Sequence, residues 1–381
     1  MNSSSATSNF SSGALKCHSW ITQYLNISRK DITLDELNSV LVLRLLGGIT
    51  FVSLLAAIGL VGNIHVIYIF GWKFTRSTDY RVFVLWLGWI DIVTTSIYAP
   101  MLVYYLLKPL TFYSDLLCKA FRFLQYLCAI CSNCALLVIA INRCLKILRP
   151  LRLPMTPRTA KINCGVSLVV AVCLSWPAIP LFSVVNSPTG IEGFTGKRCL
   201  VRMDNFSKFK MFNGSNIIFF IVVLFILIFS YTLIGWRIKH RFKTSRAPSE
   251  SYNMERRFLS ATSSSFREPQ SSSSGSIPFQ TRNNGKEESA VRKQQNRSVE
   301  NNTTGTLVYI LSSLPYHILS IMFFVIPNFD CNLTFIQSLF FYIFIWSYLL
   351  NSVANPFIYG FRDRRFRKKL CIFYKKNFVV K

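Results

Sequence analysis

Seven long apolar segments follow one another along this chain of 381 residues, and short polar stretches separate them. Each is long enough for a helix that crosses a bilayer, which needs about 20 predominantly apolar residues. Asp91 is the only formally charged residue within them. The expected spans are residues 45–70, 82–107, 123–141, 162–185, 211–236, 306–327 and 333–359. We therefore expect an all-α membrane protein with a seven-transmembrane helix bundle, or six spans if the fourth segment is re-entrant.

Lysine and arginine gather on one side of the expected bundle. Residues 71–81 hold three, residues 143–161 hold six and residues 360–381 hold nine, against two in residues 108–119 and five in residues 187–210. Because cytoplasmic loops carry the excess of these residues, we expect the N-terminus outside the cell and the C-terminus in the cytosol. Most of the net charge of +27 then faces anionic lipid of the inner leaflet, and no nucleic-acid partner is expected.

This topology predicts three regions. Residues 1–44 form an extracellular tail, residues 45–359 form the bundle, and residues 360–381 form an amphipathic helix with a cytoplasmic tail. Inside the bundle, residues 237–305 are rich in Ser, Asn, Arg and Glu, which predicts a disordered inner loop whose serines kinases can reach. The ends of this loop, near residues 237–243 and 291–297, are expected to extend the fifth and sixth helices into the cytosol. Sequons of the form Asn-x-Ser/Thr predict glycosylation on the outer side, at Asn2, Asn9, Asn26, Asn205, Asn213 and Asn332.

Four of the eleven cysteines fall on the outer, oxidising side, namely Cys17, Cys118, Cys199 and Cys331. A bond between Cys118 and Cys199 would pin the second outer loop over the bundle and leave Cys17 with Cys331, but four cysteines allow three pairings. Cysteines at 128, 131 and 134 have metal-like spacing without histidine or carboxylate, so they are interpreted as small packing residues. Cys371, among basic residues after the last span, is a candidate for palmitoylation.

Asp91 is an ionisable group inside the membrane, and such groups are functional candidates because they are costly to bury. The alternative is a protonated or hydrogen-bonded carboxyl that serves packing. Asn351 and Asn355 lie four residues apart on one helical face. Carboxylate, hydroxyl and amide oxygens suit a small hard cation, so we expect a sodium ion and no other cofactor. The expected sodium ligands are Asp91, Ser132, Asn351 and Asn355, with Asn63 nearby.

The third segment carries a stripe of polar and aromatic residues at helical spacing, Arg122, Gln125, Tyr126 and Ala129, which could line an outward cavity or simply pack. On the sixth segment, Pro315 should kink the helix just before Tyr316 and His317. The expected ligand-binding residues are Tyr105, Arg122, Gln125, Tyr126, Tyr316, His317 and Phe341.

The last span ends in "NPFIYGFRDRRF", and apolar residues then alternate with arginine and lysine. This pattern predicts a basic amphipathic helix on the inner membrane face. Pro356 frees a carbonyl one turn earlier, so the span is expected to contain a weak, polar joint.

These motifs together resemble the rhodopsin-like (class A) G-protein-coupled receptor family. The matching motifs are Gly62-Asn63, Leu87-x-x-x-Asp91, the pair Cys118 and Cys199, and Asn355-Pro356-Phe357-Ile358-Tyr359. The resemblance implies a Cys118–Cys199 disulfide, a plasma-membrane location, and coupling to heterotrimeric G proteins by outward movement of the sixth helix. It also implies arrestin and receptor kinases as partners. The residues implied in coupling are Asn142, Arg143, Tyr231 and Tyr359.

The chain departs from the family pattern at two positions that bear on activation. The family's Asp-Arg-Tyr reads Asn142-Arg143-Cys144, and its Cys-Trp-x-Pro reads Ser312-Ser313-Leu314-Pro315. Because Arg143 lacks an adjacent carboxylate, we hypothesise raised basal activity, which restoring Asp at position 142 should lower.

Ligand class is indicated by a few outer residues. Gln125 stands where amine receptors of the family carry an aspartate, so a biogenic amine is not expected, and the seventh span has no retinal-type lysine. The motif Leu314-Pro315-Tyr316-His317 is similar to that of many peptide receptors, so the resemblance implies a neuropeptide ligand. Basic outer residues favour an acidic one, and a receptor for a small acidic or lipid ligand is the alternative.

Three other classes are rivals, and a transporter is the main one. A seven-span transporter would usually show an internal repeat, and a channel would show a charge ring or filter loop, neither of which is visible. One buried carboxylate and four scattered histidines do not supply the acid/base cluster of an enzyme.

Overall fold

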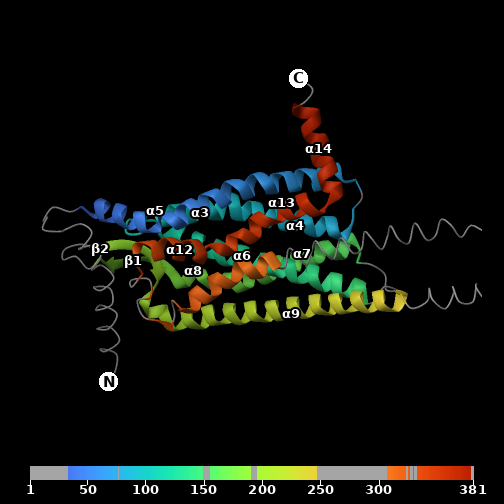
Figure 1. Cartoon of the computed structure of the whole chain (residues 1–381). Coiled ribbons are helices and arrows are strands. Elements are labelled where there is room, and N and C mark those ends of the chain that lie inside the picture. Colours follow the sequence, from blue (N-terminus) through green and yellow to red (C-terminus); the bar gives the residue numbers. More distant parts are fainter. Residues whose placement is uncertain are drawn as a thin grey trace, which may run out of the picture.

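The computed structural model describes residues 33–75, 77–148, 155–189, 195–246, 307–322, 325–326, 329 and 333–378. Within them, long helices run side by side as an elongated bundle (Figure 1). Six are long and apolar enough to cross a membrane, and the shorter helix Leu307–Met322 lies beside them. The expected helical membrane bundle is therefore confirmed, and the fourth segment is one of the long candidate spans, Pro157–Leu181.

Several spans are built from consecutive helical pieces. The first is α3 (Leu34–Tyr68) with a π-helical turn at Ile69–Lys73, and the second is α4 (Asp79–Val93), a π-helical turn at Thr94–Tyr98 and α5 (Ala99–Leu107). The third is α6 (Asp115–Leu148), and the fourth is α7 (Pro157–Ser175) followed by α8 (Ala178–Leu181). The last three are α9 (Phe206–Arg246), the helix Leu307–Met322, and α12 (Phe335–Ile345) joined through Ser347–Leu349 to α13 (Leu350–Arg362).

The bundle exposes apolar side chains and buries polar ones. On α7, Ile162, Val166 and Val169 follow one helical face and are 57%, 55% and 62% exposed. Asn63, Asp91 and most of the serines between the helices are buried. An exposed apolar face such as that of α7 is unfavourable in water but favourable in the hydrocarbon core of a bilayer. The side-chain pattern therefore indicates which surface faces lipid.

The first helix begins at Leu34, eleven residues before the expected span. Thr33 caps it, because the Thr33 hydroxyl accepts from the Glu36 N–H and the Glu36 carboxylate accepts from the Thr33 N–H. This capping box is visible in the sequence as Thr-x-x-Glu, a signal that hydropathy does not register. Asn38 in the added turns donates to the Leu107 carbonyl and accepts from the Leu110 N–H, at 3.0 Å each. The boundary expected at residue 44 was therefore placed too late.

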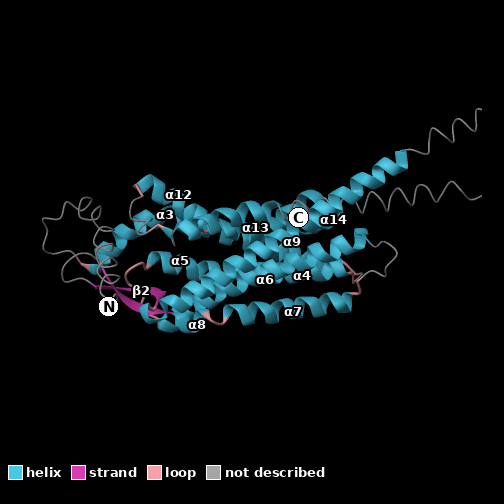
Figure 2. Cartoon of the chain, turned by 90° about the horizontal axis from the view of Figure 1, so that it is seen from below, coloured by secondary structure: helices cyan, strands magenta, loops and turns pink. Residues whose placement is uncertain are grey.

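The loop between the fourth and fifth spans forms a β-hairpin, which was not expected from the sequence (Figure 2). Strand β1 (Phe182–Pro188) pairs antiparallel with β2 (Thr195–Val201), and Val184 lies opposite Cys199. Residues 182–185 had been expected to end the fourth span, but they belong to a strand. Prolines 177 and 180 interrupt regular helix, and the β-branched valines that follow favour a pleated strand.

The last two helices meet at a sharp corner. Helix α14 (Arg364–Phe378) leaves the end of α13 across the direction of the bundle (Figure 1). The Asp363 carboxylate accepts from the backbone N–H groups of Arg365 and Phe366, so it caps α14. The Phe366 ring is buried and stacks on Phe70, with centroids 5.7 Å apart. The expected helix after the last span is confirmed.

The fifth span continues as helix to Arg246. This agrees with the expectation that the stretch near residues 237–243 extends the fifth helix beyond its span. The remainder of that loop lies outside the described residues.

Candidate functional site

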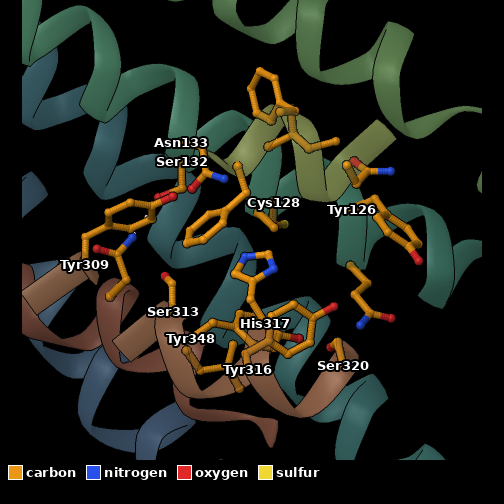
Figure 3. Close-up of a pocket in the computed structure, with 18 of the residues that line it drawn as sticks. Tyr126, Cys128, Ser132, Asn133, Tyr309, Ser313, Tyr316, His317, Ser320 and Tyr348 are labelled. Carbon is orange, nitrogen blue, oxygen red and sulfur yellow. Dashed lines mark hydrogen bonds between the residues drawn. The ribbon is translucent and has the colours of Figure 1, made fainter. Parts of the chain in front are cut away.

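A cavity lies between α6, α9, the 307–322 helix and the last span (Figure 3). Its empty space, counted out to the open mouth, is about 940 Å³. Its lining residues include Gln125, Tyr126, Ser132, Asn213, Asn216, Ile217, Phe220, Tyr309, Ser313, Tyr316, His317, Ser320, Tyr348 and Asn351. A cleft with a few polar groups on aromatic walls is typical of a site for a small ligand or for the end of a longer one.

The expected ligand-binding residues divide into three groups. Gln125 and Tyr126 of α6, with Tyr316 and His317 of the 307–322 helix, line the cavity as expected. Tyr105 contacts Arg122 instead, since the Arg122 Cζ lies 4.9 Å from its ring centroid. Phe341 does not line this cavity, and its ring packs against Phe329 and Tyr342.

Two polar stripes were missed. Along the 307–322 helix, Tyr309, Ser313, Tyr316 and Ser320 recur at intervals of four, three and four residues and face the cavity together. Along α9, the lining residues are Asn213, Asn216, Ile217 and Phe220, again at helical spacing. Asn213 was expected to be a glycosylation site, but its place in the third turn of α9 makes it a wall residue. The period of 3.6 residues, applied to serines and amides as well as to apolar residues, would have found both stripes.

Aromatic rings line part of the cavity and contact one another. The hydroxyls of Tyr98 and Tyr348 are hydrogen-bonded to one another, and the Tyr316 ring meets Tyr348 edge to face at 4.8 Å. His317 stacks on Phe220 with centroids 3.6 Å apart. These contacts join four elements at one level and fix the rotamers of the side chains that a ligand would touch.

Arg122 lies within a cage of three aromatic rings next to the cavity. Its Cζ is 4.9 Å from the Tyr105 and Phe182 centroids and 5.0 Å from that of Phe121. Its Nη1 donates to Gln125 Oε1 at 2.9 Å, and its Nη2 donates to the Cys199 carbonyl at 3.4 Å. Its buried Nε has no hydrogen-bond partner among the described residues. The guanidinium is thus a half-buried cation held by rings and neutral oxygens, and no carboxylate in the described part of the chain forms an ion pair with it.

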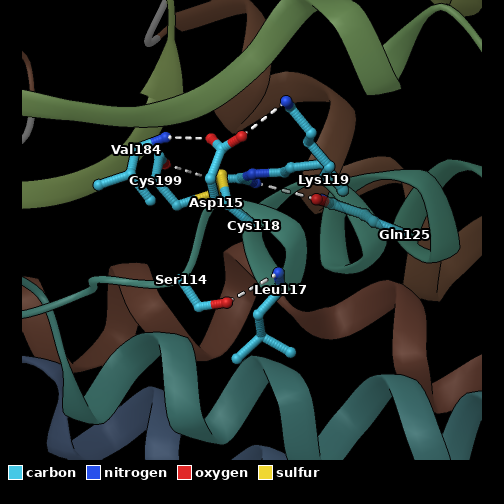
Figure 4. The surroundings of a disulfide bond; sticks show 9 residues. Ser114, Asp115, Leu117, Cys118, Lys119, Gln125, Val184 and Cys199 are labelled. Carbon is cyan, nitrogen blue, oxygen red and sulfur yellow. Dashed lines mark hydrogen bonds and ion pairs between the residues drawn. A yellow bond between two sulfur atoms is a disulfide. The ribbon is translucent and has the colours of Figure 1, made fainter.

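One face of α6 fastens the hairpin to the bundle (Figure 4). Cys118 and Cys199 form the expected disulfide, with Cα atoms 5.5 Å apart. One helical turn earlier, the Asp115 carboxylate accepts from the Val184 N–H at 3.0 Å, and one turn later Arg122 reaches the Cys199 carbonyl. The hairpin is therefore fixed at three successive turns above the cavity. The pair Cys17 and Cys331, like Asn2, Asn9, Asn26 and Asn332, lies outside the described residues.

The polar layer predicted around Asp91 is present. Asn355 Nδ2 donates to Asp91 Oδ2 at 2.8 Å, and Asn351 Nδ2 donates to the Ser132 hydroxyl at 2.9 Å. Asp91 is fully buried, and its Oδ1 has no hydrogen-bond partner among the described residues, nor has Asn63 Oδ1. Ser132 and Asn351 also line the bottom of the cavity, so the outer site and this layer are continuous.

At the end of the bundle away from the hairpin, expected here to be the inner end, the residues expected to couple are held by aromatic and acidic neighbours. The Arg143 Cζ lies 5.3 Å from the Tyr80 ring centroid, and Asn142 Nδ2 donates to Asp79 Oδ2 at 2.7 Å. Tyr359 packs edge to face on Phe70 at 5.7 Å. Tyr231 packs on an apolar cluster shared by the inner ends of α6 and α9, made of Cys144, Ile147 and Ile234.

Three closely spaced cysteines on α6 are buried, as expected for packing residues. Cys128, Cys131 and Cys134 are buried free thiols. Within the described ranges, no three histidine, cysteine or acidic side chains gather into a metal site. Cys371 is exposed on α14.

Comparison with known proteins places this geometry in a family. Residues 62–359 match the family model of the seven-transmembrane receptors of the rhodopsin family. The muscarinic acetylcholine receptor M3 of Mus musculus is 24% identical over 70% of this chain and 44% of its own length. The cysteinyl leukotriene receptor 1 of Sus scrofa is 22% identical over 49% of this chain and 54% of its own, and a melanopsin of Rutilus rutilus is 30% identical over 32% and 25%.

The chain thus spans about half or less of the length of each of these relatives. The family match covers more than half of the chain and includes the cavity, the polar layer and the inner end. Members of this family are signalling receptors and not enzymes. The chain belongs to the rhodopsin family of seven-transmembrane receptors.

Proposed function

We propose that this protein is a cell-surface receptor that passes the signal of an extracellular ligand to heterotrimeric G proteins. The family match supports the class, and the transporter alternative is no longer needed. The cavity lies near the end of the bundle that carries the disulfide and the hairpin, and disulfides persist on the oxidising side of a membrane. The basic helix α14 lies at the other end, as expected for a cytosolic face.

The proposed ligand is a peptide with an acidic group that reaches Arg122. The single observation that carries this choice is the caged guanidinium without a carboxylate partner among the described residues. A charge in a low-dielectric site gains most from an opposite charge that arrives with the ligand. The similarity of Leu314-Pro315-Tyr316-His317 to peptide receptors supports the peptide class, and Tyr316 and His317 line the cavity.

A screen of peptides against a panel of G-protein sensors tests this proposal in cells that express the full chain. For an active acidic peptide, Arg122→Gln should raise the half-effective concentration about tenfold or more, because a charge-assisted pair is lost. Arg122→Lys should retain part of the response, since Lys keeps the charge but not the planar fork. Lys119→Gln is the matched control, because Lys119 is an exposed cation one turn away that pairs with Asp115.

A modified ligand sharpens the test. Amidating the ligand's carboxylate should cost the unmodified receptor the same factor, and it should cost Arg122→Gln almost nothing. Equal losses in the two receptors would contradict contact between the acidic group and Arg122.

A second candidate ligand is a small acidic or lipid molecule. The same guanidinium favours it, as does the likeness to a cysteinyl leukotriene receptor. A response to acidic lipid fractions, with none to peptides, would select this candidate. Acetylcholine-like amines are disfavoured because Gln125 is neutral, and retinal is disfavoured because the last span has no lysine for a Schiff base.

The sodium site also remains a proposal. The residues present fit a small hard cation, since the buried Asp91 Oδ1 and Asn63 Oδ1 have no partner among the described residues and the nearby donors are oxygens. Asp91, Ser132, Asn351 and Asn355 would hold the ion, and its charge would neutralise the buried carboxylate there.

Further partners follow from the proposed class. Arrestin and receptor kinases are proposed at the inner face, and anionic lipid is proposed along α14, where Arg364, Arg365 and Arg367 are exposed. Cys371 is accessible there for palmitoylation. Glycosylation is proposed at Asn205, which lies just before α9, and at the sequons in the outer tail.

A further inference from the structure

The first two residues of α4 contact three residues of α6 at the inner end of the bundle. The Asp79 carboxylate accepts from Asn142 Nδ2 at 2.7 Å and pairs with the Lys146 ammonium. The next residue, Tyr80, places its ring 5.3 Å from the Arg143 Cζ. Positions 142, 143 and 146 share one side of α6. One helical turn of α4 thus meets the segment of α6 that contains Arg143.

Burial makes the loss of either partner of this contact costly. The residues Asp79 and Asn142 are 9% and 4% exposed, and the side chain of Lys146 is 27% exposed. Exposed pairs contribute little, whereas removing one partner of a buried pair leaves an uncompensated charge. Among the described residues at the inner ends of the helices, only Asp79 and Asp363 carry carboxylates, so Asp79 has no acidic substitute beside it.

The second carboxylate extends the contact to the cytosolic helix. The Tyr80 hydroxyl donates to Asp363 Oδ2 at 3.5 Å, and Asp363 caps α14. Tyr80 therefore lies between Arg143 on one side and the corner of α13 and α14 on the other.

We propose that Asp79 and Tyr80 are positioning residues that hold the inner end of α6 against α4 in the ligand-free protein, and that breaking their contact raises ligand-independent coupling. This inference rests on the proposed function. It also reverses the expectation for position 142. The carboxylate missing beside Arg143 is supplied from α4, so Asn142→Asp would place two carboxylates together and would raise basal signalling instead of lowering it.

The first experiment measures nucleotide exchange without ligand on a panel of G proteins, normalised to the amount of receptor at the cell surface. Asp79→Asn should raise exchange about fivefold or more. Asp79→Glu should stay near the unmodified level because it keeps the charge. Asp35→Asn is the control, since Asp35 also lies in the first turn of a helix but forms no ion pair across helices among the described residues.

An exchange of the two side chains separates positioning from simple capping of α4. Asp79→Asn and Asn142→Asp should each raise exchange, and the double variant should return toward the unmodified level because the amide–carboxylate pair is restored in reverse. If Asp79 served only the helix dipole of α4, the double variant would be no lower than Asp79→Asn. Lys146→Met removes the cation that pairs with Asp79. It should raise nucleotide exchange even if the Asp79→Asn receptor does not reach the cell surface.

Thermal unfolding, which needs no G protein, distinguishes failure of this inference from failure of the proposed function. In purified full-length receptor, the losses of thermal stability in Asp79→Asn and Lys146→Met should not add up in the variant that carries both changes, since the two residues touch. Non-additive unfolding with unchanged basal exchange, in a receptor that still responds to ligand, would overturn the inference and leave the proposed function intact. Additive unfolding would overturn the contact itself. Absence of exchange in every variant, with and without ligand, would overturn both.

Discussion

Asp91 has one carboxylate oxygen bonded to Asn355, and the other is buried without a partner among the described residues. Ser132 and Asn351 lie in the same layer and reach the cavity. A buried charge is costly unless it is neutralised, so this layer is complete only with a proton or a cation. Oxygen donors from three helices make sodium the better-suited partner.

Replacing Asp91 by Asn tests that assignment at the level of one residue. The unmodified receptor in detergent should melt a few degrees higher in sodium chloride than in potassium chloride, because an ion that binds only the folded state stabilises it. Asp91→Asn should melt at the same temperature in both salts. Asp79→Asn, which removes a different buried carboxylate, should keep the difference. An unchanged sodium response in Asp91→Asn would refute the site.

At the scale of elements, two helices approach so closely that only glycine fits. A Cβ on Gly47 of α3 would lie 2.6 Å from the Leu339 carbonyl oxygen of α12. That oxygen belongs to the backbone, so it cannot rotate away. On α7, by contrast, a Cβ on Gly165 would meet nothing within 4 Å. The first and last spans are therefore fitted to one another, and α7 has open space at this point.

These two glycines provide a matched pair of variants. Gly47→Ala should destabilise the folded receptor by about 1–3 kcal/mol, because overpacking forces the helices apart. Gly165→Ala should leave stability unchanged or raise it by up to about 1 kcal/mol, since alanine favours helix. Thermal unfolding of both purified variants gives the comparison. Equal melting temperatures would mean that α3 and α12 do not touch at Gly47.

The sequence predicted elements better than their ends. Hydropathy located every span because about 20 apolar residues leave a strong pattern. It missed the start at Leu34, where a capping box determines the helix end, and it missed the hairpin, whose valines resemble a continuation of the fourth span. Site residues on one helix, such as Gln125 and Tyr126, could be predicted from spacing. The Arg122 cage and the Asp79–Asn142 contact could not, because they depend on how separate helices align.

At the scale of the whole molecule, an odd number of spans requires the chain ends to lie on opposite sides of the membrane. An epitope tag before residue 33 should bind antibody on intact cells, and a tag after residue 378 should bind only after permeabilisation, because basic loops stay in the cytosol. Flow cytometry of the two tagged receptors measures this directly. Labelling of both ends in intact cells would contradict the seven-helix count.

Helix α6 runs from Asp115 to Leu148 without a single proline or glycine, a length of about 50 Å. Its first turns hold the hairpin, its middle lines the cavity, and its last turns carry Arg143. An unbroken α-helix has no hinge at which a displacement can be absorbed. A tilt of α6 caused by a ligand at the hairpin end would therefore also displace the end that carries Arg143, so α6 can transmit a ligand-induced movement along its whole length.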